Sequence, residues 1–178
     1  MKSLTLLRHA KSGWDDPVTR DFDRPLNPRG RRAARTVGRE MKAQGLGFDL
    51  VLASPARRVV ETLEEVEAAY GALQPDYDQR LYLASTATLL EIVRGVPDRV
   101  ERLLLVGHNP GLEEIALRLS GRDADGLRGE VEVKYPTGTV AEIVLPVERW
   151  AEVKEGIGRI ERFIRPRDLD PELGPDSE

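Results

Sequence analysis

Short apolar runs recur along the chain, and most of them stop abruptly at polar residues. The runs at 4–7, 49–53 and 102–107 have the length and composition of strands that are buried on both faces, as in the interior of a parallel sheet. Two later runs, 140–145 and 159–164, are expected to be antiparallel neighbours. The pattern therefore predicts a mostly parallel sheet with a mixed edge.

Helical periodicity follows each of the three buried runs. The pairs Asn27-Pro28, Ser54-Pro55 and Asn109-Pro110 each combine an N-cap residue with a proline suited to the first helical position. Strands that alternate with helices in this way favour right-handed crossovers, with helices on both faces of the sheet. The sequence predicts an α/β fold of three layers, an αβα sandwich around a mostly parallel mixed sheet.

The strand and helix pattern ends near residue 166. A length of 178 residues suits one domain, and we expect a single domain over 1–166. Prolines and alternating charges in 167–178 favour a flexible C-terminal tail. The polar segments 13–26 and 123–130 lack periodicity and are expected to be loops.

Composition narrows the function classes. The 27 Lys and Arg residues are balanced by 31 Asp and Glu residues, and the absence of a strongly basic stripe argues against nucleic acid as a partner. The chain contains no cysteine, which excludes thiolate metal sites, and only two histidines, so neither a metal nor another cofactor is expected. No apolar stretch is long enough for a signal peptide or a membrane span, and the expected location is the cytoplasm.

The two histidines both follow buried runs. Arg8 and His9 come directly after the first run, and His108 follows the run at 102–107. Ligands of open α/β sheets bind beyond the carboxyl ends of the strands, so both histidines are expected to lie in one crevice. The alternative is that each is a structural histidine at a strand end.

Arg57 and Arg58 lie in the first turn of the predicted helix after Ser54-Pro55. A cation is unfavourable there because the helix macrodipole is positive at that end. A bound phosphate or sulfate would explain both arginines. A surface ion pair with Glu61 or Glu65 is the alternative, and we favour it for Arg57.

Three blocks of the sequence resemble the signature motifs of the histidine phosphatase (phosphoglycerate-mutase-like) superfamily. They are Arg8-His9-Ala10, the segment 54–58 with Thr62, and Gly107-His108-Asn109-Pro110. The segment 24–30 and Arg165-Pro166 look most like the small SixA-type phosphohistidine phosphatases. The resemblance implies a phosphoglycerate-mutase-like fold and a phosphatase activity.

By position, the resemblance implies that His9 is the nucleophile and is transiently phosphorylated. It implies that Arg8, Arg58 and His108 bind the phosphoryl group, with Arg58 chosen because Thr62 follows it by four residues. An attacking His9 must be neutral, so its other ring nitrogen is expected to donate to a backbone carbonyl. His108 is expected to act in its protonated form, which a neighbouring phosphate would favour.

Lys11 and Ser12 are further candidates for substrate binding because they follow the nucleophile directly. Closing the turn is an equally good explanation of both, and an ion pair with Asp15 would account for Lys11.

One position departs from the superfamily. Larger relatives carry a glutamate that protonates a leaving alcohol, and here that position holds Leu83. An imidazole leaving group has a reference pKa of about 6.5 and can depart already protonated. We therefore expect a phosphohistidine-bearing protein as the substrate. A loop carboxylate could still supply a proton; the candidates are Asp15, Asp16, Asp21 and Asp23.

Two alternatives remain open at this point. One is a phosphatase of small phosphate esters, acting on a phosphorylated metabolite. The other is a regulatory module that binds phosphorylated partners without turnover. In either case no nucleic acid or membrane partner is expected.

Overall fold

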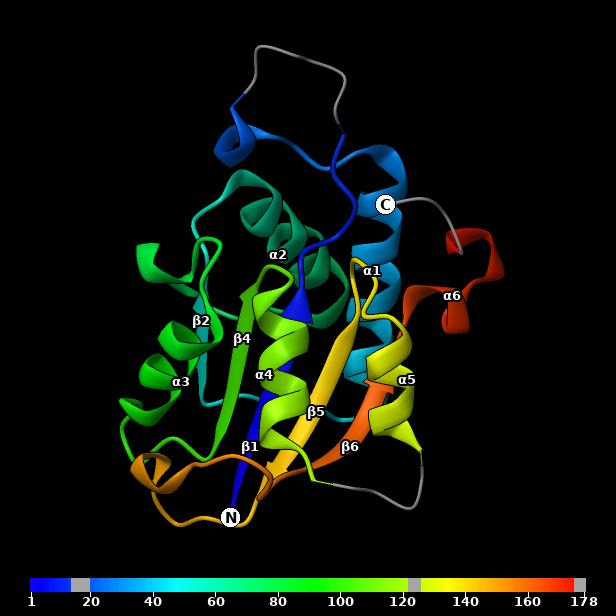
Figure 1. Ribbon diagram of the computed structural model, residues 1–178. Coiled ribbons are helices and arrows are strands. Elements are labelled where there is room, and N and C mark those ends of the chain that lie inside the picture. The colour runs from blue at the N-terminus through cyan, green and yellow to red at the C-terminus, as the bar shows by residue number, and fades with distance from the viewer. Residues whose placement is uncertain (14–19, 122–125, 175–178) are drawn as a thin grey trace.

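The computed structural model describes residues 1–13, 20–121 and 126–174, and within them six strands form one sheet. The strands are β1 (Lys2–Arg8), β2 (Leu50–Ala53), β3 (Asp76–Tyr77), β4 (Arg102–Gly107), β5 (Val140–Leu145) and β6 (Arg159–Ile164). Their order across the sheet is β3-β2-β4-β1-β5-β6 (Figure 1). Strands β1 to β4 run parallel, whereas β5 pairs antiparallel with both β1 and β6. The predicted mixed sheet is confirmed.

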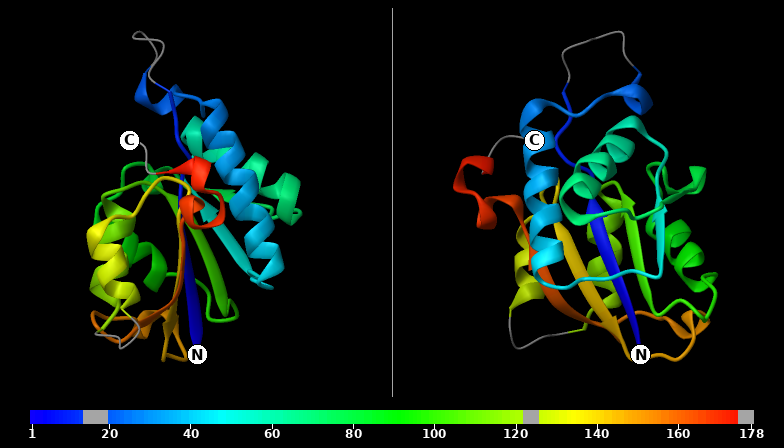
Figure 2. Two further views of the ribbon diagram at one scale, coloured as in Figure 1. Left: turned by 90° about the vertical axis from the view of Figure 1, so that its right-hand side faces the viewer. Right: turned by 180° about the vertical axis from the view of Figure 1, so that it is seen from behind.

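Helices cover both faces of this sheet, as predicted (Figure 2). Helices α1 and α2 lie on one face, and α3, α4 and α5 lie on the other. The helices are α1 (Pro28–Ala43), α2 (Arg57–Tyr70), α3 (Thr86–Arg94), α4 (Gly111–Leu119), α5 (Leu127–Val133) and α6 (Pro166–Leu169). No helix in the described part of the chain is long and apolar enough to cross a membrane.

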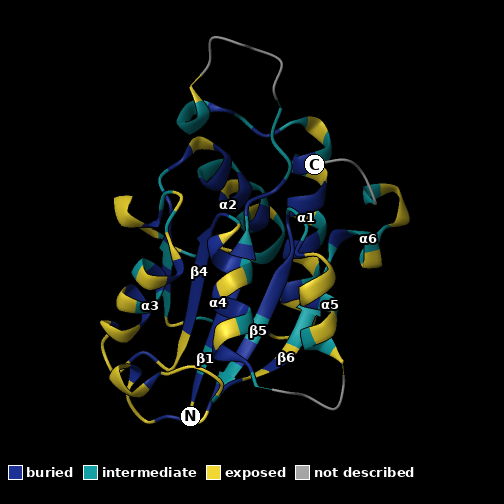
Figure 3. Ribbon diagram, in the orientation of Figure 1, coloured by how far each residue is buried: buried dark blue, intermediate teal, exposed yellow. Residues whose placement is uncertain are grey.

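The sheet separates two apolar cores. In β4, Leu103 and Leu105 pack with α3 and α4, whereas Leu104 and Val106 pack with α1 and α2. This division follows from the alternation of side chains along a strand. Figure 3 shows the inner strands buried along most of their length. An uninterrupted apolar run is therefore needed at the centre of the sheet, and this is the pattern that identified β4 in the sequence.

The helix starts differ in detail from the predictions. Asn27 caps α1 as expected, with its side chain accepting a hydrogen bond from the amide of Gly30 at 2.7 Å. Helix α2 instead begins at Arg57, and Ser54 lies outside it because its hydroxyl bonds a histidine ring described below. The loop expected over 123–130 is wrong at its end, since α5 begins at Leu127; residues 122–125 lie outside the described part.

The C-terminal segment contains short helical turns in its described part, and its flexibility stays a prediction. Residues 167–169 belong to α6, and Pro171–Leu173 form a 3-10 turn. Arg32 of α1 explains this order, because its guanidinium pairs with both Asp170 and Glu172. Leu169 adds an apolar contact with the core beneath α1. Residues 175–178 lie outside the described part of the chain.

Gly30 is packed so closely that it offers a stability test. A Cβ at this position would overlap the carbonyl oxygen of Lys11. Gly30→Ala is therefore expected to lower the free energy of unfolding by about 1–3 kcal/mol. Gly129, in the first turn of α5, has nothing within 4 Å of its ideal Cβ. Gly129→Ala should instead stabilise the protein by up to about 1 kcal/mol. Urea unfolding of both variants checks the pair, and equal effects would contradict the close packing at Gly30.

Candidate active site

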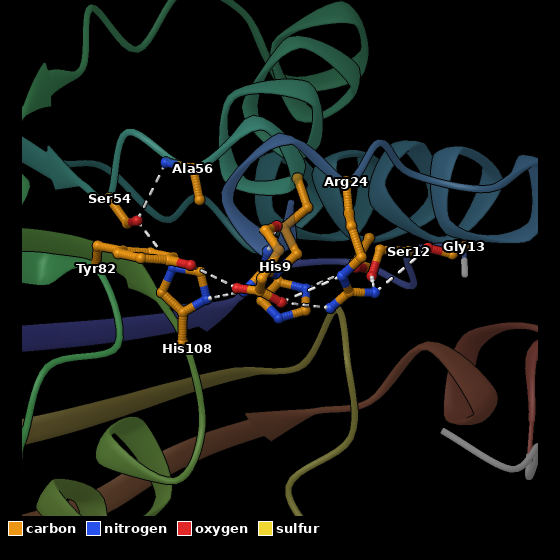
Figure 4. A network of polar contacts seen from close by, with 11 residues as sticks. His9, Ser12, Gly13, Arg24, Ser54, Ala56, Tyr82 and His108 are labelled. Atoms are coloured by element: carbon orange, nitrogen blue, oxygen red, sulfur yellow. Dashed lines mark hydrogen bonds and ion pairs between the residues drawn. The ribbon is translucent and has the colours of Figure 1, made fainter. Parts of the chain in front are cut away.

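The two histidines meet at the carboxyl ends of the central strands. Arg8 of β1 lies opposite Gly107 of β4, so His9 and His108 follow at the same level. The amide of His9 donates to the Gly107 carbonyl at 3.0 Å, and the two ring centroids are 5.2 Å apart. Both side chains are buried, with 7% and 4% of their surface exposed. The structure thus brings together the pair that the sequence placed in one crevice (Figure 4).

The His9 ring is held in one tautomer. Its Nδ1 lies 2.7 Å from the carbonyl oxygen of Ala10. A carbonyl only accepts, so Nδ1 carries the hydrogen and Nε2 keeps its lone pair. Burial lowers the pKa of His9 well below its usual value, and the nearby His108, Arg8 and Arg58 lower it further, while the bond to Ala10 acts in the opposite direction. His9 is therefore a neutral imidazole at neutral pH.

Arg58 connects His108 to Asp21. It is 2% exposed, and its Nη2 donates to His108 Nδ1 at 3.2 Å. Its Nη1 and Nη2 also donate to the backbone carbonyl and the carboxylate of Asp21, at 2.7 and 3.0 Å. Arg57, in contrast, is exposed and pairs with Glu61 at 2.8 Å. The two neighbouring arginines therefore have different environments, as the sequence analysis favoured.

Thr62, four residues after Arg58, bonds both Arg58 and the segment that follows His9. Its hydroxyl donates to the carbonyl of Arg58 at 2.6 Å and accepts from the amide of Ala10 at 2.9 Å. One buried side chain thus ties α2 to the residue that follows His9. The spacing in the sequence is the spacing of one helical turn, which brings Thr62 over Arg58.

The hydrogen bonds of His108 hold its ring in the neutral form in this structure. A guanidinium only donates, so His108 Nδ1 must accept from Arg58, and Nε2 donates to the Ser54 hydroxyl at 2.8 Å. Burial and the charge of Arg58 lower the pKa of His108 to about 3, although Asp21 partly opposes them. Protonation of His108 beside a bound phosphate remains a prediction.

Among the described residues, Asp21 supplies the carboxylate that hydrogen-bonds to Arg58 and to its neighbours in the site. It accepts from the Tyr82 hydroxyl at 2.6 Å, from Arg58 and from Arg24. Burial raises the pKa of Asp21, but the bonds from Tyr82, Arg58 and Arg24 outweigh it and lower the value to about 2. Asp21 is therefore ionised at neutral pH and holds no proton to donate. Sequence reasoning proposed it as an acid and missed its role as an anchor for Arg58.

Tyr82 is a site residue that sequence reasoning missed. Its ring lies edge-on to the His108 ring, with centroids 5.5 Å apart, while its hydroxyl binds Asp21. The next residue, Leu83, is 55% exposed and has a φ of +51°. The position of the missing acid therefore carries an apolar side chain at the surface. The signal in the sequence that could have identified Tyr82 is its place, as an aromatic residue, directly before the position where a catalytic acid was expected.

The other candidate residues, Arg8, Lys11, Ser12 and the loop acids, have separate partners or lie outside the described residues. Arg8 Nη1 donates to the carbonyl of Tyr135 at 2.9 Å. The Ser12 hydroxyl accepts from Arg24 at 2.7 Å, which favours the turn-closing explanation for Ser12. Lys11 lines a neighbouring hollow. Of the loop acids, Asp23 pairs with Arg20 at 3.0 Å, whereas Asp15 and Asp16 lie outside the described residues, and with them the proposed Lys11–Asp15 pair.

The polar groups of the site favour an anion. Arg8, Arg58 and Arg24 converge on two neutral imidazoles and one carboxylate. The Nε of Arg58 is buried and makes no hydrogen bond in the described part of the chain. In the same part, no three or more His, Asp or Glu side chains are grouped so that they could hold a metal ion. Guanidinium groups in such a cluster match the oxygens of a phosphoryl group.

The depressed pKa of His108 predicts how stability depends on pH. Unfolded His108 binds a proton near pH 6.5, but the folded protein resists it down to about pH 3. Between these values the unfolded state binds more protons, so the unfolding free energy falls as the pH falls. The contribution is at most about 1.4 kcal/mol per pH unit. Urea unfolding between pH 6.5 and 4.5 should therefore give a steeper slope for the wild type than for His108→Gln. Parallel curves would contradict the neutral His108.

Comparisons with known proteins identify the family of this chain. Residues 4–82 match the model of the histidine phosphatase superfamily (branch 1). An uncharacterized protein of Mycobacterium tuberculosis is 37% identical over 164 residues, which cover 90% of this chain and 100% of the relative.

Two solved structures are also similar in both sequence and fold. A candidate phosphohistidine phosphatase SixA of Agrobacterium tumefaciens is 28% identical with a TM-score of 0.78, covering 93% of this chain and 98% of that one. A candidate SixA phosphatase of Nakamurella multipartitia is 27% identical with a TM-score of 0.80, covering 93% and 96%. From these similarities, the chain belongs to the histidine phosphatase superfamily and is SixA-like.

Proposed function

We propose that this phosphatase acts without a metal, through a phosphohistidine intermediate on His9, and dephosphorylates phosphohistidine in a protein. The observation that carries the proposal is the neutral His9 ring, whose Nδ1 hydrogen is bound by Ala10 and whose Nε2 is left with a lone pair beside Arg58 and His108. Such a ring is a nucleophile without any further activation.

The reaction has two steps. His9 Nε2 attacks phosphorus, the P–N bond of the substrate breaks, and the imidazole leaves with a proton. Water then attacks phospho-His9, which releases inorganic phosphate and restores the neutral ring. Arg8, Arg58 and His108 hold the phosphoryl oxygens and spread the negative charge of both transition states.

In the part of the chain that the structure describes, neither Asp21 nor the expected acid position offers a proton, which supports phosphohistidine over an ester. Asp21 is ionised, with a pKa of about 2, and Leu83 stands where larger relatives carry a glutamate. A general acid contributes roughly a hundredfold or more when the leaving group is an alkoxide. An imidazole, with a reference pKa of about 6.5, needs no such help. The two SixA structures named above, described as candidate phosphohistidine phosphatases, support the same substrate class.

Phosphate release from a phosphohistidine-bearing protein and from p-nitrophenyl phosphate, compared side by side without added metal, tests the proposal. We expect faster release from phosphohistidine. Faster release from the ester would favour a phosphatase of small phosphorylated metabolites. Saturable binding of the phosphoprotein with no phosphate released would favour a regulatory module.

A further inference from the structure

A hollow lies beside the segment that follows His9. It is shallow and opens to solvent, with an enclosed volume of about 40 Å³. Residues from the start of α1, from the segment before β5 and from α6 form its walls; Figure 2 shows α6 lying close to α1. Among the described residues no carboxylate lines it, whereas five cations do: Lys11, Arg29, Lys134, Arg165 and Arg167.

The five cations do not share one environment, because Arg165 is ion-paired with Asp168 and Glu130 at 2.8 and 3.4 Å. Arginines such as Arg32, Arg35 and Arg57 are ion-paired with carboxylates. Lys134 and Arg167 make no ion pair and no side-chain hydrogen bond anywhere in the part of the chain that the structure describes. Like charges gathered around a concave surface produce a positive potential that attracts anions.

The hollow is connected to the catalytic group through backbone hydrogen bonds. Lys11 follows His9 by two residues, and its carbonyl accepts from the amide of Asn27 at 3.0 Å. The amide of Gly138, just beyond the lining residue Thr137, donates to the carbonyls of Arg8 and His9 at 3.1 and 2.9 Å. The hollow therefore lies beside the backbone segment that carries His9.

We infer that this hollow binds carboxylate side chains next to the phosphohistidine of the substrate protein. The inference rests on the proposed function and adds a specificity for acidic surroundings. Aspartate and glutamate oxygens fit a group of lysine and arginine donors. Ion pairs in an open, solvated hollow are weak and are screened by salt. We therefore expect these cations to give a modest preference for acidic substrates that decreases as the ionic strength rises.

Two phosphohistidine peptides of equal length test it, one with glutamates flanking the phosphohistidine and one with glutamines. The kcat/KM ratio of acidic to neutral peptide is expected to be roughly three- to tenfold for the wild type at low salt. In Lys134→Ala/Arg167→Ala the ratio should fall to about one. Lys42→Ala/Lys154→Ala removes the same charge from two exposed lysines that have no partner in the described chain, and it should keep the wild-type ratio.

Binding of the unphosphorylated acidic peptide, measured by calorimetry, separates this inference from the proposed function. Binding that weakens only in Lys134→Ala/Arg167→Ala supports the hollow even if neither phosphopeptide is hydrolysed, which would refute the proposed function alone. Equal rates on both peptides and equal binding by all three proteins would overturn the inference. Tripolyphosphate provides a further test. If it inhibits the wild type but not Lys134→Ala/Arg167→Ala, and if both peptides react at equal rates, the hollow binds a small polyanion and the inference is overturned.

Discussion

Replacing His9 with alanine is expected to slow phosphate release from a phosphohistidine substrate by about 10⁴-fold or more. Removal of a covalent nucleophile leaves only the transition-state stabilisation by the surrounding groups. Here those groups are Arg8, Arg58 and His108, which the substitution leaves in place. Release of inorganic phosphate under saturating substrate measures the effect on kcat.

A matched variant separates chemistry from positioning. His9→Asn keeps a side-chain N–H that can donate to the Ala10 carbonyl, but it has no nucleophilic nitrogen. Both variants should be equally inactive, and neither should form the acid-labile, alkali-stable phosphoenzyme expected of the wild type. Activity in His9→Asn within tenfold of wild type would assign His9 a structural role.

The second large effect is expected at Arg58. Arg58→Ala should lower kcat/KM by about 10²- to 10³-fold, the range seen when one preorganised donor to a developing charge is removed. The same change removes the donors that hold Asp21 and His108 in place. Steady-state kinetics on the phosphohistidine substrate measures the loss. Arg58→Lys should restore little of it, because an ammonium cannot reproduce the planar fork of donors.

The neighbouring arginine is the control. Arg57 is exposed and pairs with Glu61, and a surface ion pair is worth about 0–1 kcal/mol. Arg57→Ala should therefore retain kcat/KM within about twofold. Equal losses at the two positions would contradict the assignment of Arg58 to the phosphoryl site.

The central strands and the residues that follow them were predictable because their signals are local. A strand buried on both faces favours an apolar run; β4 has an unbroken one, and in β1 only Thr5, itself buried, interrupts it. Parallel neighbours end at the same edge of the sheet, so His9 and His108 had to lie close together once β1 and β4 were adjacent. The spacing of Arg58 and Thr62 is likewise one helical turn.

The protonation and partners of these residues depend on the tertiary structure. Ser54 had the local chemistry of an N-cap, but the fold brings His108 within 2.8 Å of its hydroxyl, and the helix begins later, at Arg57. Asp21 had the chemistry of a proton donor, but Arg24, Arg58 and Tyr82 converge on it from separate segments. The pKa of a carboxyl group depends on such neighbours and on burial, which distant residues supply.

The sequence by itself determined the layered α/β fold and the meeting of His9 and His108 at neighbouring strand ends, because periodicity and strand ends are properties of neighbouring residues. Only the tertiary structure decided that His108 is held neutral by Arg58 and Ser54, and that Asp21 is an anchor for Arg58. It also decided that residues 167–173 fold against α1 and help to form a cationic hollow. Long-range electrostatics and packing act between residues far apart in the chain, and no local pattern records them.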